Sequence, residues 1–538
     1  MDYQHKKYYQ YFFLITFIFI SVIYFAGYFK IGLLSDSYED AYLSVTSGLK
    51  DKFTDQIYHF RFRPLLFLTL QGIVTLSGYL NLAFDNFIIY NLFNLTLYLI
   101  LAAVSGITIL SISNDFKKAL LAVIIILIFP NNIHNLCWSA AFVELLTGIF
   151  YISSIFFSTK FIKSDRRIYV FLSLLFFVLA LLTKEIAITI PAAVFLINYI
   201  AFKKEKLKSI IKITSSHIIV VIPYFVFRLF VLKSIPYSGL PSFSMNPLSA
   251  VFDVISKAII SLFVPLDYLI IKLNIIQSNV LIYIYLIGLF ISVLYFLFLL
   301  KKSKLIFNTI LAIVLFIIII SPFVVAGYMR PQLIIIPFIS ILLVMFVILN
   351  EFSFKKIPAI IITLFFLSFW VIWGIQTISS WDIAFTEGKK KMNVLLNTEF
   401  DKNKTPLIIG NLSRTNQYFA FDNLNYSYNY WKHHGFVLND TIYQEIRTVA
   451  LDFNSINTRI NYFKIGNNEY EINTAGDYQF FIIDEFMKPI AGDVLKTGKI
   501  EITVLKTDLN GKPIQLKIKI LSDSFETFLF SGYELIKL

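Results

Sequence analysis

The sequence predicts a polytopic α-helical membrane protein with about 11 transmembrane helices and a C-terminal, mostly β extracytoplasmic domain. First, the 538-residue chain is 57% hydrophobic and only 15% charged, with a mean hydropathy of +0.72. Second, apolar runs long enough to cross a bilayer recur up to residue 378. Third, the later residues are richer in Asn, Asp, Lys and Gly. We therefore expect a transmembrane domain over 1–379 and an extracytoplasmic β-rich domain over 380–538.

The predicted spans follow from the thickness of the bilayer, because a helix needs roughly 20 apolar residues to cross it. Suitable runs lie near 9–29, 84–112, 117–130, 140–159, 168–183, 186–202, 213–232, 279–300, 305–325, 331–349 and 357–378. Two further apolar stretches, 64–80 and 249–272, are expected to lie at the outer surface. This assignment keeps the Lys and Arg clusters on one face of the membrane.

Lys and Arg predict the orientation, because they gather in cytoplasmic loops. Their clusters lie at 6–7, 117–118, 160–167, 203–212, 301–304 and 355–356. The outward segments are then 30–63, 131–139, 183–186, 233–278, 326–330 and the C-terminal domain. The net charge of +13 comes from the membrane part, since residues 381–538 hold 18 Lys and Arg against 19 Asp and Glu. The positive excess thus indicates membrane topology and not a nucleic-acid partner.

The C-terminal domain is predicted to be β-rich because short runs of alternating polarity are separated by turn residues. The predicted strands cover 406–412, 479–484, 500–506, 514–521 and 527–538. An aromatic stretch at 418–431 allows two interpretations. It forms part of the domain core, which we favour, or it stacks on sugar rings.

Charged side chains lie at the predicted outer ends of several spans. Lys184 and Glu185 interrupt an apolar stretch, and a charge at membrane depth costs about 2.5–3.5 kcal/mol, which marks a functional site unless the pair sits at the water boundary. Arg228 and Arg330 either bind a lipid phosphate or anchor the chain among headgroups. Glu144 begins a span, where the helix dipole alone favours an acid.

The outer loop after the first span is acidic and then basic. Asp36, Glu39 and Asp40 come first, and Arg61 and Arg63 follow. Carboxylates and guanidiniums beside a membrane suit a site that activates a hydroxyl and holds a phosphate. The alternative is an ordinary hydrated loop.

Several motifs are absent from the sequence. There is no Gly-rich phosphate loop, no G-x-S-x-G and no Cys-x-x-Cys pair, so nucleotide-driven pumps and standard hydrolases are not expected. The single Cys137 cannot form an intramolecular disulfide. His134, His433 and His434 lack the spacing of zinc ligands.

A series of short motifs follows the order found in a known family. In that family an acidic pair follows the first span, and Arg-Pro-Leu, Pro, Trp, Glu-Leu-Leu, Leu-Leu-Ser/Thr-Lys-Glu, Pro and Tyr-x-x-x-Arg come next. Asn-Pro-Leu and a later Pro-Leu with Asp-Tyr complete the series. The counterparts here are SDSYED (35–40), Arg63–Leu65, Pro130, Trp138, Glu144–Leu146, Leu181–Glu185, Pro191, Tyr224, Arg228, Asn246–Leu248 and Pro265–Tyr268. Over residues 1–380 the chain resembles the GT-C superfamily of membrane glycosyltransferases. It is most similar to the protein O-mannosyltransferase-like branch, including the membrane half of the transmembrane O-mannosyltransferases that carry tetratricopeptide repeats.

The resemblance implies a GT-C-like fold that transfers a sugar, with inversion, from a polyprenyl-phosphate-linked donor to an acceptor hydroxyl on the outer face. It implies Asp36 as general base; Ser37 replaces the second acid of the pair, which leaves Glu39 or Asp40 as the second carboxylate. The expected donor-phosphate ligands are Lys184, Arg228, Arg330 and Arg63, with Glu185, Glu144 and Trp138 in support. We expect no cofactor, and no residue pattern requires a divalent metal.

The expected partners are the polyprenyl-phosphate-sugar donor, membrane lipids and a protein, lipid or glycan acceptor. The short loops and the lack of disulfides favour a bacterial inner membrane. Two other functional classes are alternatives to a glycosyltransferase. A lipid or glycan transporter or flippase needs polar residues through the bilayer midplane and usually internal repeats, whereas here the charges gather on one face. A non-catalytic envelope-assembly scaffold would bind through its β domain.

Overall fold

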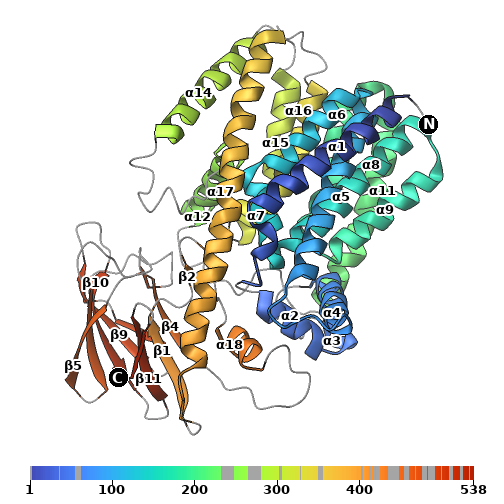
Figure 1. Cartoon of the computed structure of the whole chain (residues 1–538). Helices are drawn as coiled ribbons and strands as arrows, with labels where there is room; N and C mark the ends of the chain where they lie inside the picture. The colour runs from blue at the N-terminus through green and yellow to red at the C-terminus, as the bar shows by residue number, and fades with distance from the viewer. Residues whose placement is uncertain are drawn as a thin grey trace. The chain divides into compact units, whose positions relative to one another are not determined.

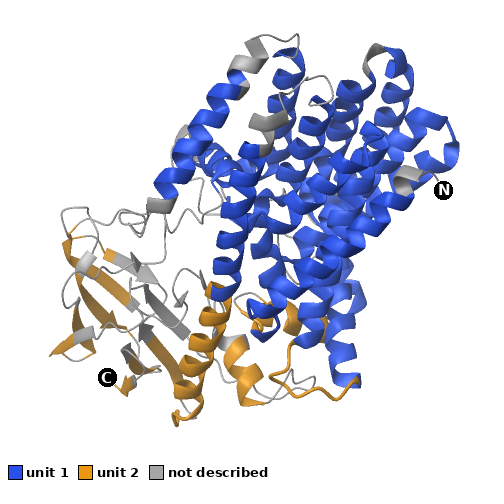
Figure 2. Ribbon diagram, turned by 45° about the horizontal axis from the view of Figure 1, so that its top comes forward, with its two compact units in different colours: residues 1–30, 47–79, 88–379 blue, residues 31–46, 80–87, 380–538 orange. Residues whose placement is uncertain are grey.

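The structure is a computed structural model of the whole chain. It describes residues 3–34, 37–54, 62–231, 247–264, 280–301, 306–326, 329–348, 356–401, 404–410, 414–415, 418–419, 424–433, 447–452, 460–466, 468–474, 481–482, 491–492, 494–497, 500–507, 513–521, 525–531 and 534–537. The chain divides into two compact units (Figure 2). The first comprises residues 1–30, 47–79 and 88–379, and the second comprises residues 31–46, 80–87 and 380–538.

The first unit is helical (Figure 1). Its α-helices are α1 (Tyr3–Phe25), α3 (Leu49–Thr54), α4 (Pro64–Tyr79), α5 (Ile88–Ser113), α6 (Phe116–Ile128), α7 (Pro130–Cys137), α8 (Phe142–Ser164), α9 (Arg167–Leu181), α10 (Ile190–Phe202), α11 (Leu207–Val231), α12 (Pro247–Phe263), α14 (Val280–Lys301), α15 (Ile306–Ala326), α16 (Ile335–Ile348) and the first part of α17 (Lys356–Leu396). Short 3-10 turns are η1 (Tyr28–Lys30), η2 (Ser139–Ala141), η3 (Glu185–Thr189), η4 (Lys203–Lys206) and η7 (Pro331–Ile334).

Eight helical stretches within the described part of the chain are long and apolar enough to cross a membrane. They are Lys6–Phe25, Ile88–Ser113, Ser139–Ser164, Glu185–Phe202, Leu207–Arg228, Ile306–Ala326, Pro331–Ile348 and Ile361–Leu396. A ninth is formed if α6 and α7, which meet at a bend of 61°, count as one span. The predicted spans 168–183 and 279–300 coincide with the shorter apolar helices Arg167–Leu181 and Ile282–Tyr295, so the count of about eleven stays a prediction.

Each of the two apolar stretches predicted not to cross contains a helix within its described residues. α4 has 16 residues. α12 has 17 residues and is amphipathic, since Val254, Ala258 and Ser261 are buried while Phe252 and Phe263 on other faces are exposed. Neither helix is among the eight long candidates.

In the first unit, Gly106 of α5 allows residues of α1 and α6 to approach closely. α5 lies against α6 and α8, and α1 lies against α6 (Figure 1). At Gly106 in α5, a Cβ atom would lie 2.3 Å from the Tyr8 hydroxyl and 2.7 Å from a Val123 methyl. Only glycine fits there, and small residues at helix contacts are typical of membrane bundles.

The second unit contains α2 (Ser37–Thr46), the last part of α17, α18 (Leu424–Lys432) and all the strands. The strands are β1 (Thr405–Gly410), β2 (Arg414–Thr415), β3 (Tyr418–Phe419), β4 (Arg447–Asp452), β5 (Ile460–Gly466), β6 (Glu469–Thr474), β7 (Phe481–Ile482), β8 (Val494–Thr497), β9 (Ile500–Thr507), β10 (Pro513–Ile520), β11 (Phe525–Ser531) and β12 (Glu534–Lys537). The predicted strand-rich C-terminal region is confirmed.

The strands form two five-stranded sheets and one two-stranded ladder of β2 and β3. One sheet has the order β12-β11-β1-β4-β7, with β1 parallel to both β11 and β4. The other is antiparallel, with the order β5-β6-β10-β9-β8. In β10, Leu516, Ile518 and Ile520 are buried, and Lys517 and Lys519 on the opposite face form ion pairs with Glu469. This is the alternation that a half-buried strand requires.

Candidate functional site

The candidate site begins where the helical backbone is interrupted between α9 and α10. The Leu182 amide donates to the Val178 carbonyl at 3.0 Å, and the Lys184 amide donates to the Ala180 carbonyl at 2.9 Å. Lys184 then leaves the helical path with an extended backbone, φ −159° and ψ 146°, and η3 starts at Glu185. The break places two charged side chains between two apolar helices.

Lys184 is paired with Glu144. Its Nζ donates a hydrogen bond to Oε1 of Glu144, which lies in the first turn of α8. Both side chains are only 5% exposed, and the ammonium also lies 5.5 Å from the ring centre of Phe323. The pair is therefore enclosed by protein within the first unit.

Glu185 is held between two arginines. Arg63 Nη2 donates to Glu185 Oε2 at 3.0 Å, and Arg228 Nη1 lies 3.6 Å from Oε1. The Leu65 amide donates to the Leu182 carbonyl at 3.2 Å, which fixes the start of α4 beside the break. Arg228 in α11 is 1% exposed and also donates to the Tyr224 hydroxyl at 3.0 Å.

Arg63, Glu144, Lys184, Glu185 and Arg228 together form what we call the charged cluster. It contains three cations and two carboxylates, so its formal charge is one positive unit. Oε2 of Glu144 is buried and has no hydrogen-bond partner in the described part of the chain. Guanidinium and ammonium groups form charge-assisted hydrogen bonds with phosphate and carboxylate oxygens, so the three cations make the cluster suited to bind an anionic group.

Arg330 and Trp138 lie on neighbouring elements. Arg330 is half-buried and immediately precedes η7, which contacts α7. Trp138 is half-buried at the end of α7, and its carbonyl accepts a hydrogen bond from Asn94 Nδ2 at 3.3 Å. The ion pairs described above do not involve Arg330.

The predicted acids lie on and before α2, in the second unit. Asp36, the expected base, lies outside the described residues. Glu39 and Asp40 occupy the first turn of α2, where the helix dipole favours carboxylates. Asp40 is buried at 9% exposure, and Glu39 is half-buried.

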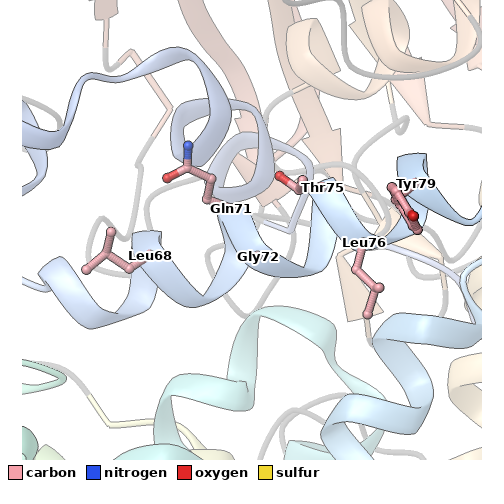
Figure 3. A pocket seen from close by; sticks show the side chains of 6 residues that line it. All are labelled: Leu68, Gln71, Gly72, Thr75, Leu76 and Tyr79. Carbon is pink, nitrogen blue, oxygen red and sulfur yellow. The ribbon is translucent and has the colours of Figure 1, made fainter.

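A groove of about 630 Å³ follows one face of α4 (Figure 3). Its lining residues are Leu68, Gln71, Gly72, Thr75, Leu76 and Tyr79. Gln71 and Thr75 add an amide and a hydroxyl to an otherwise largely apolar surface. The groove therefore suits an apolar chain with few polar contacts.

The sequence interpretation missed a buried polar cluster inside the bundle. His217 Nε2 lies 3.1 Å from both the Ser154 and Ser173 hydroxyls, and its Nδ1 lies 2.8 Å from the Ile213 carbonyl. These residues join α8, α9 and α11 at positions that are fully buried. The only signal in the sequence was one histidine within an apolar run.

No three His, Cys, Asp or Glu side chains come together as metal ligands within the described ranges. Cys137 is buried. His134 is buried in α7, and His434 lies outside the described residues. Comparison of the chain with protein-family models and with curated proteins found no match.

Proposed function

We propose that the protein is an integral membrane glycosyltransferase that moves a sugar from a polyprenyl-phosphate-linked donor to an acceptor hydroxyl on the outer face of the membrane. The observation that carries this proposal is the charged cluster, in which Lys184 and Glu185 are buried between apolar helices and form ion pairs with Glu144, Arg63 and Arg228. The order of motifs shared with the GT-C superfamily supports it.

The charge of the donor suits the cations of the cluster. A polyprenyl-phosphate sugar is a phosphodiester with one negative charge, and the cluster holds two guanidinium groups and one ammonium group. The donor is anchored in lipid, so its phosphate must be recognised beside apolar helices. Arginine forms paired hydrogen bonds with phosphate oxygens, and Arg63 is the most exposed cation of the three, at 12%.

The groove on α4 offers a binding surface for the isoprenoid chain of the donor. Arg63 directly precedes α4, and the groove begins at Leu68, about 7.5 Å further along at 1.5 Å per residue. In this proposal the phosphate binds at the charged cluster and the isoprenoid chain follows the groove.

The proposed chemistry is a single displacement with inversion. The acceptor oxygen forms a bond to C1 of the sugar while the bond from C1 to the phosphate oxygen breaks, and the polyprenyl phosphate leaves with the electron pair. A carboxylate of the 36–40 segment accepts the acceptor proton. The phosphate is already a good leaving group and needs no acid. The cations stabilise the charge that develops on it.

The protein is a multi-pass protein of a bacterial inner membrane, with about eleven spans and the C-terminal domain outside. The acceptor is a protein, a lipid or a glycan. The apolar helices support membrane insertion.

The experiment that tests the proposal is a transfer assay. Purified full-length protein in lipid discs is incubated with a panel of radiolabelled polyprenyl-phosphate sugars and a membrane extract as acceptor source. We expect one donor to lose its label to a product, and the Asp36→Asn variant to abolish this transfer. If every donor binds and none reacts, the protein is not a transferase for this class.

A transporter or flippase is the second candidate, and the His217 cluster favours it. Polar side chains inside apolar helices mark ion or substrate paths in many carriers. In a carrier, His217→Leu would stop movement of a labelled lipid or glycan across a vesicle membrane. In the proposed transferase the same variant keeps its transfer rate, provided that it folds.

A further inference from the structure

The helix α18 buries aromatic side chains although it belongs to a strand-rich region. Its sequence is LNYSYNYWK, and Tyr428, Tyr430 and Trp431 are only 2%, 8% and 4% exposed. These rings lie within the stretch considered as a sugar-stacking surface. Because they are buried against protein, they are not available as an open sugar platform.

Two of these rings contact α2. The indole Nε1–H of Trp431 donates to the Tyr38 hydroxyl at 2.9 Å, and both residues are buried. The ring centres of Tyr38 and Tyr430 lie 5.2 Å apart. α2 and α18 both belong to the second unit, so the contact lies within one compact body.

The same helix contacts the segment 80–87, which also belongs to the second unit. The Tyr430 hydroxyl donates to the Phe84 carbonyl, and the Phe84 ring meets the Trp431 ring edge-on with centres 5.4 Å apart. Lys389 pairs with Asp85 at 3.2 Å and lies 5.3 Å from the Trp431 ring centre. Trp431 is therefore packed from several directions.

α2 depends on such contacts for its stability. It has ten residues, and an isolated helix of this length is unstable in water. Five of its residues, Ser37, Tyr38, Asp40, Ala41 and Ser44, are buried, and α18 is one of the elements that contact it. Tyr38 is two positions from Asp40 and adjacent to Glu39.

We propose that Trp431 and Tyr38 are positioning residues, through which α18 holds the acid-bearing helix α2 in its working conformation. The inference rests on the proposed function, in which a carboxylate of the 36–40 segment accepts the acceptor proton. It gives α18 a role in orienting the base, and not in binding sugar.

The first part of the test measures whether α2 is held, without reference to catalysis. Ser44 is fully buried in α2 and is replaced by cysteine; the native Cys137 is itself buried. Thiol labelling of Ser44→Cys in the full chain reports opening of α2. We expect Trp431→Ala to speed this labelling about tenfold or more, because it removes the ring contacts and a hydrogen bond. An unchanged labelling rate would show that Trp431 does not hold α2.

The second part measures transfer by Trp431→Phe and Tyr38→Phe in otherwise native protein. Each removes one partner of the hydrogen bond and keeps a ring. We expect each to lower kcat about three- to tenfold with an unchanged KM for the donor. The double variant should be no worse than either single one, because no indole N–H is then left buried without its acceptor. A rise in donor KM with constant kcat would contradict a role through the base.

Phe463→Leu in β5 serves as the matched control, because Phe463 is 57% exposed in the same unit. It should change neither labelling nor kcat. If the native protein transfers no sugar from any donor, the proposed function fails. The labelling result then still decides whether α18 holds α2, so the two failures are distinguishable.

Discussion

The Arg63 guanidinium donates a 3.0 Å hydrogen bond to Glu185, a residue 122 positions later in the chain. The pair joins the start of α4 to the break between α9 and α10, and Arg228 approaches the same carboxylate from α11. One acid thus orients two arginines. Glu185 is an orienting residue in this arrangement, and the arginines are the groups suited to bind phosphate.

The buried ion pair of Lys184 and Glu144 predicts that loss of one partner lowers the free energy of unfolding. Lys184→Met removes the cation and leaves the Glu144 carboxylate buried without its partner. We expect it to destabilise the protein by about 3–5 kcal/mol. Thermal unfolding in detergent, monitored by circular dichroism, measures this change.

The matched control is the double variant Lys184→Met with Glu144→Gln. It removes both charges and should recover most of the lost stability, because neither charge is then buried alone. It should nevertheless fail to use the donor. A double variant with native transfer would exclude Lys184 from donor binding.

Arg63→Lys is predicted to raise the donor KM about tenfold, because a lysine keeps the charge but cannot form two parallel hydrogen bonds to phosphate. Steady-state transfer kinetics measure the effect. Arg167→Lys is the control, since Arg167 is exposed at the opposite end of α9 from the cluster. Equal kinetics for both variants would place the phosphate elsewhere.

The groove on α4 predicts a difference between two glycines. A Cβ atom at Gly72 or at Gly78 would meet no atom within 4 Å, but only Gly72 lines the groove. Gly72→Leu should therefore weaken use of long-chain donors, whereas Gly78→Leu should not. Both changes improve helix propensity by about 1 kcal/mol, so stability does not confound the comparison. The measurement is donor KM against isoprenoid length, and equal effects of the two variants would rule out the groove.

In the proposed transferase three carboxylates are candidates for the base, and single substitutions separate them. We expect Asp36→Asn to abolish transfer, with Glu39→Gln and Asp40→Asn retaining part of it. Because an amide keeps the shape of the side chain, donor binding should be unchanged in all three. Rates of transfer beside equilibrium donor binding test this. Full activity of Asp36→Asn would move the base to Glu39 or Asp40.

Much of the charged cluster could be predicted from local sequence, but its pairing could not. Lys184 and Glu185 stand out because charges are rare inside apolar runs. Their partners Glu144 and Arg63 lie 40 and 122 positions away, and local patterns do not encode such contacts. Glu144 in particular fits the first turn of a helix equally well without any partner.

In the second unit, too, local sequence predicts single elements but not the contacts between distant segments. The alternation at 514–521 correctly predicted β10, because period-two burial is a local property. The predicted strand over 527–538 is two strands, β11 and β12. The aromatic stretch contains the helix α18 despite its many strand-favouring residues. Tertiary contacts with Tyr38 and Phe84 accompany this helix, and the grouping of 31–46 and 80–87 with the C-terminal residues has no local signature.

The central claim is that the charged cluster recognises the phosphate of a lipid-linked sugar and permits its transfer. The most direct test measures transfer from polyprenyl-phosphate sugars by the native protein and by the Lys184→Met, Glu144→Gln double variant, with both shown to be folded. We predict transfer by the native protein, competition by sugar-free polyprenyl phosphate but not by uncharged polyprenol, and no transfer by the variant. Equal transfer by the two proteins, or equal competition by the two lipids, would contradict the claim.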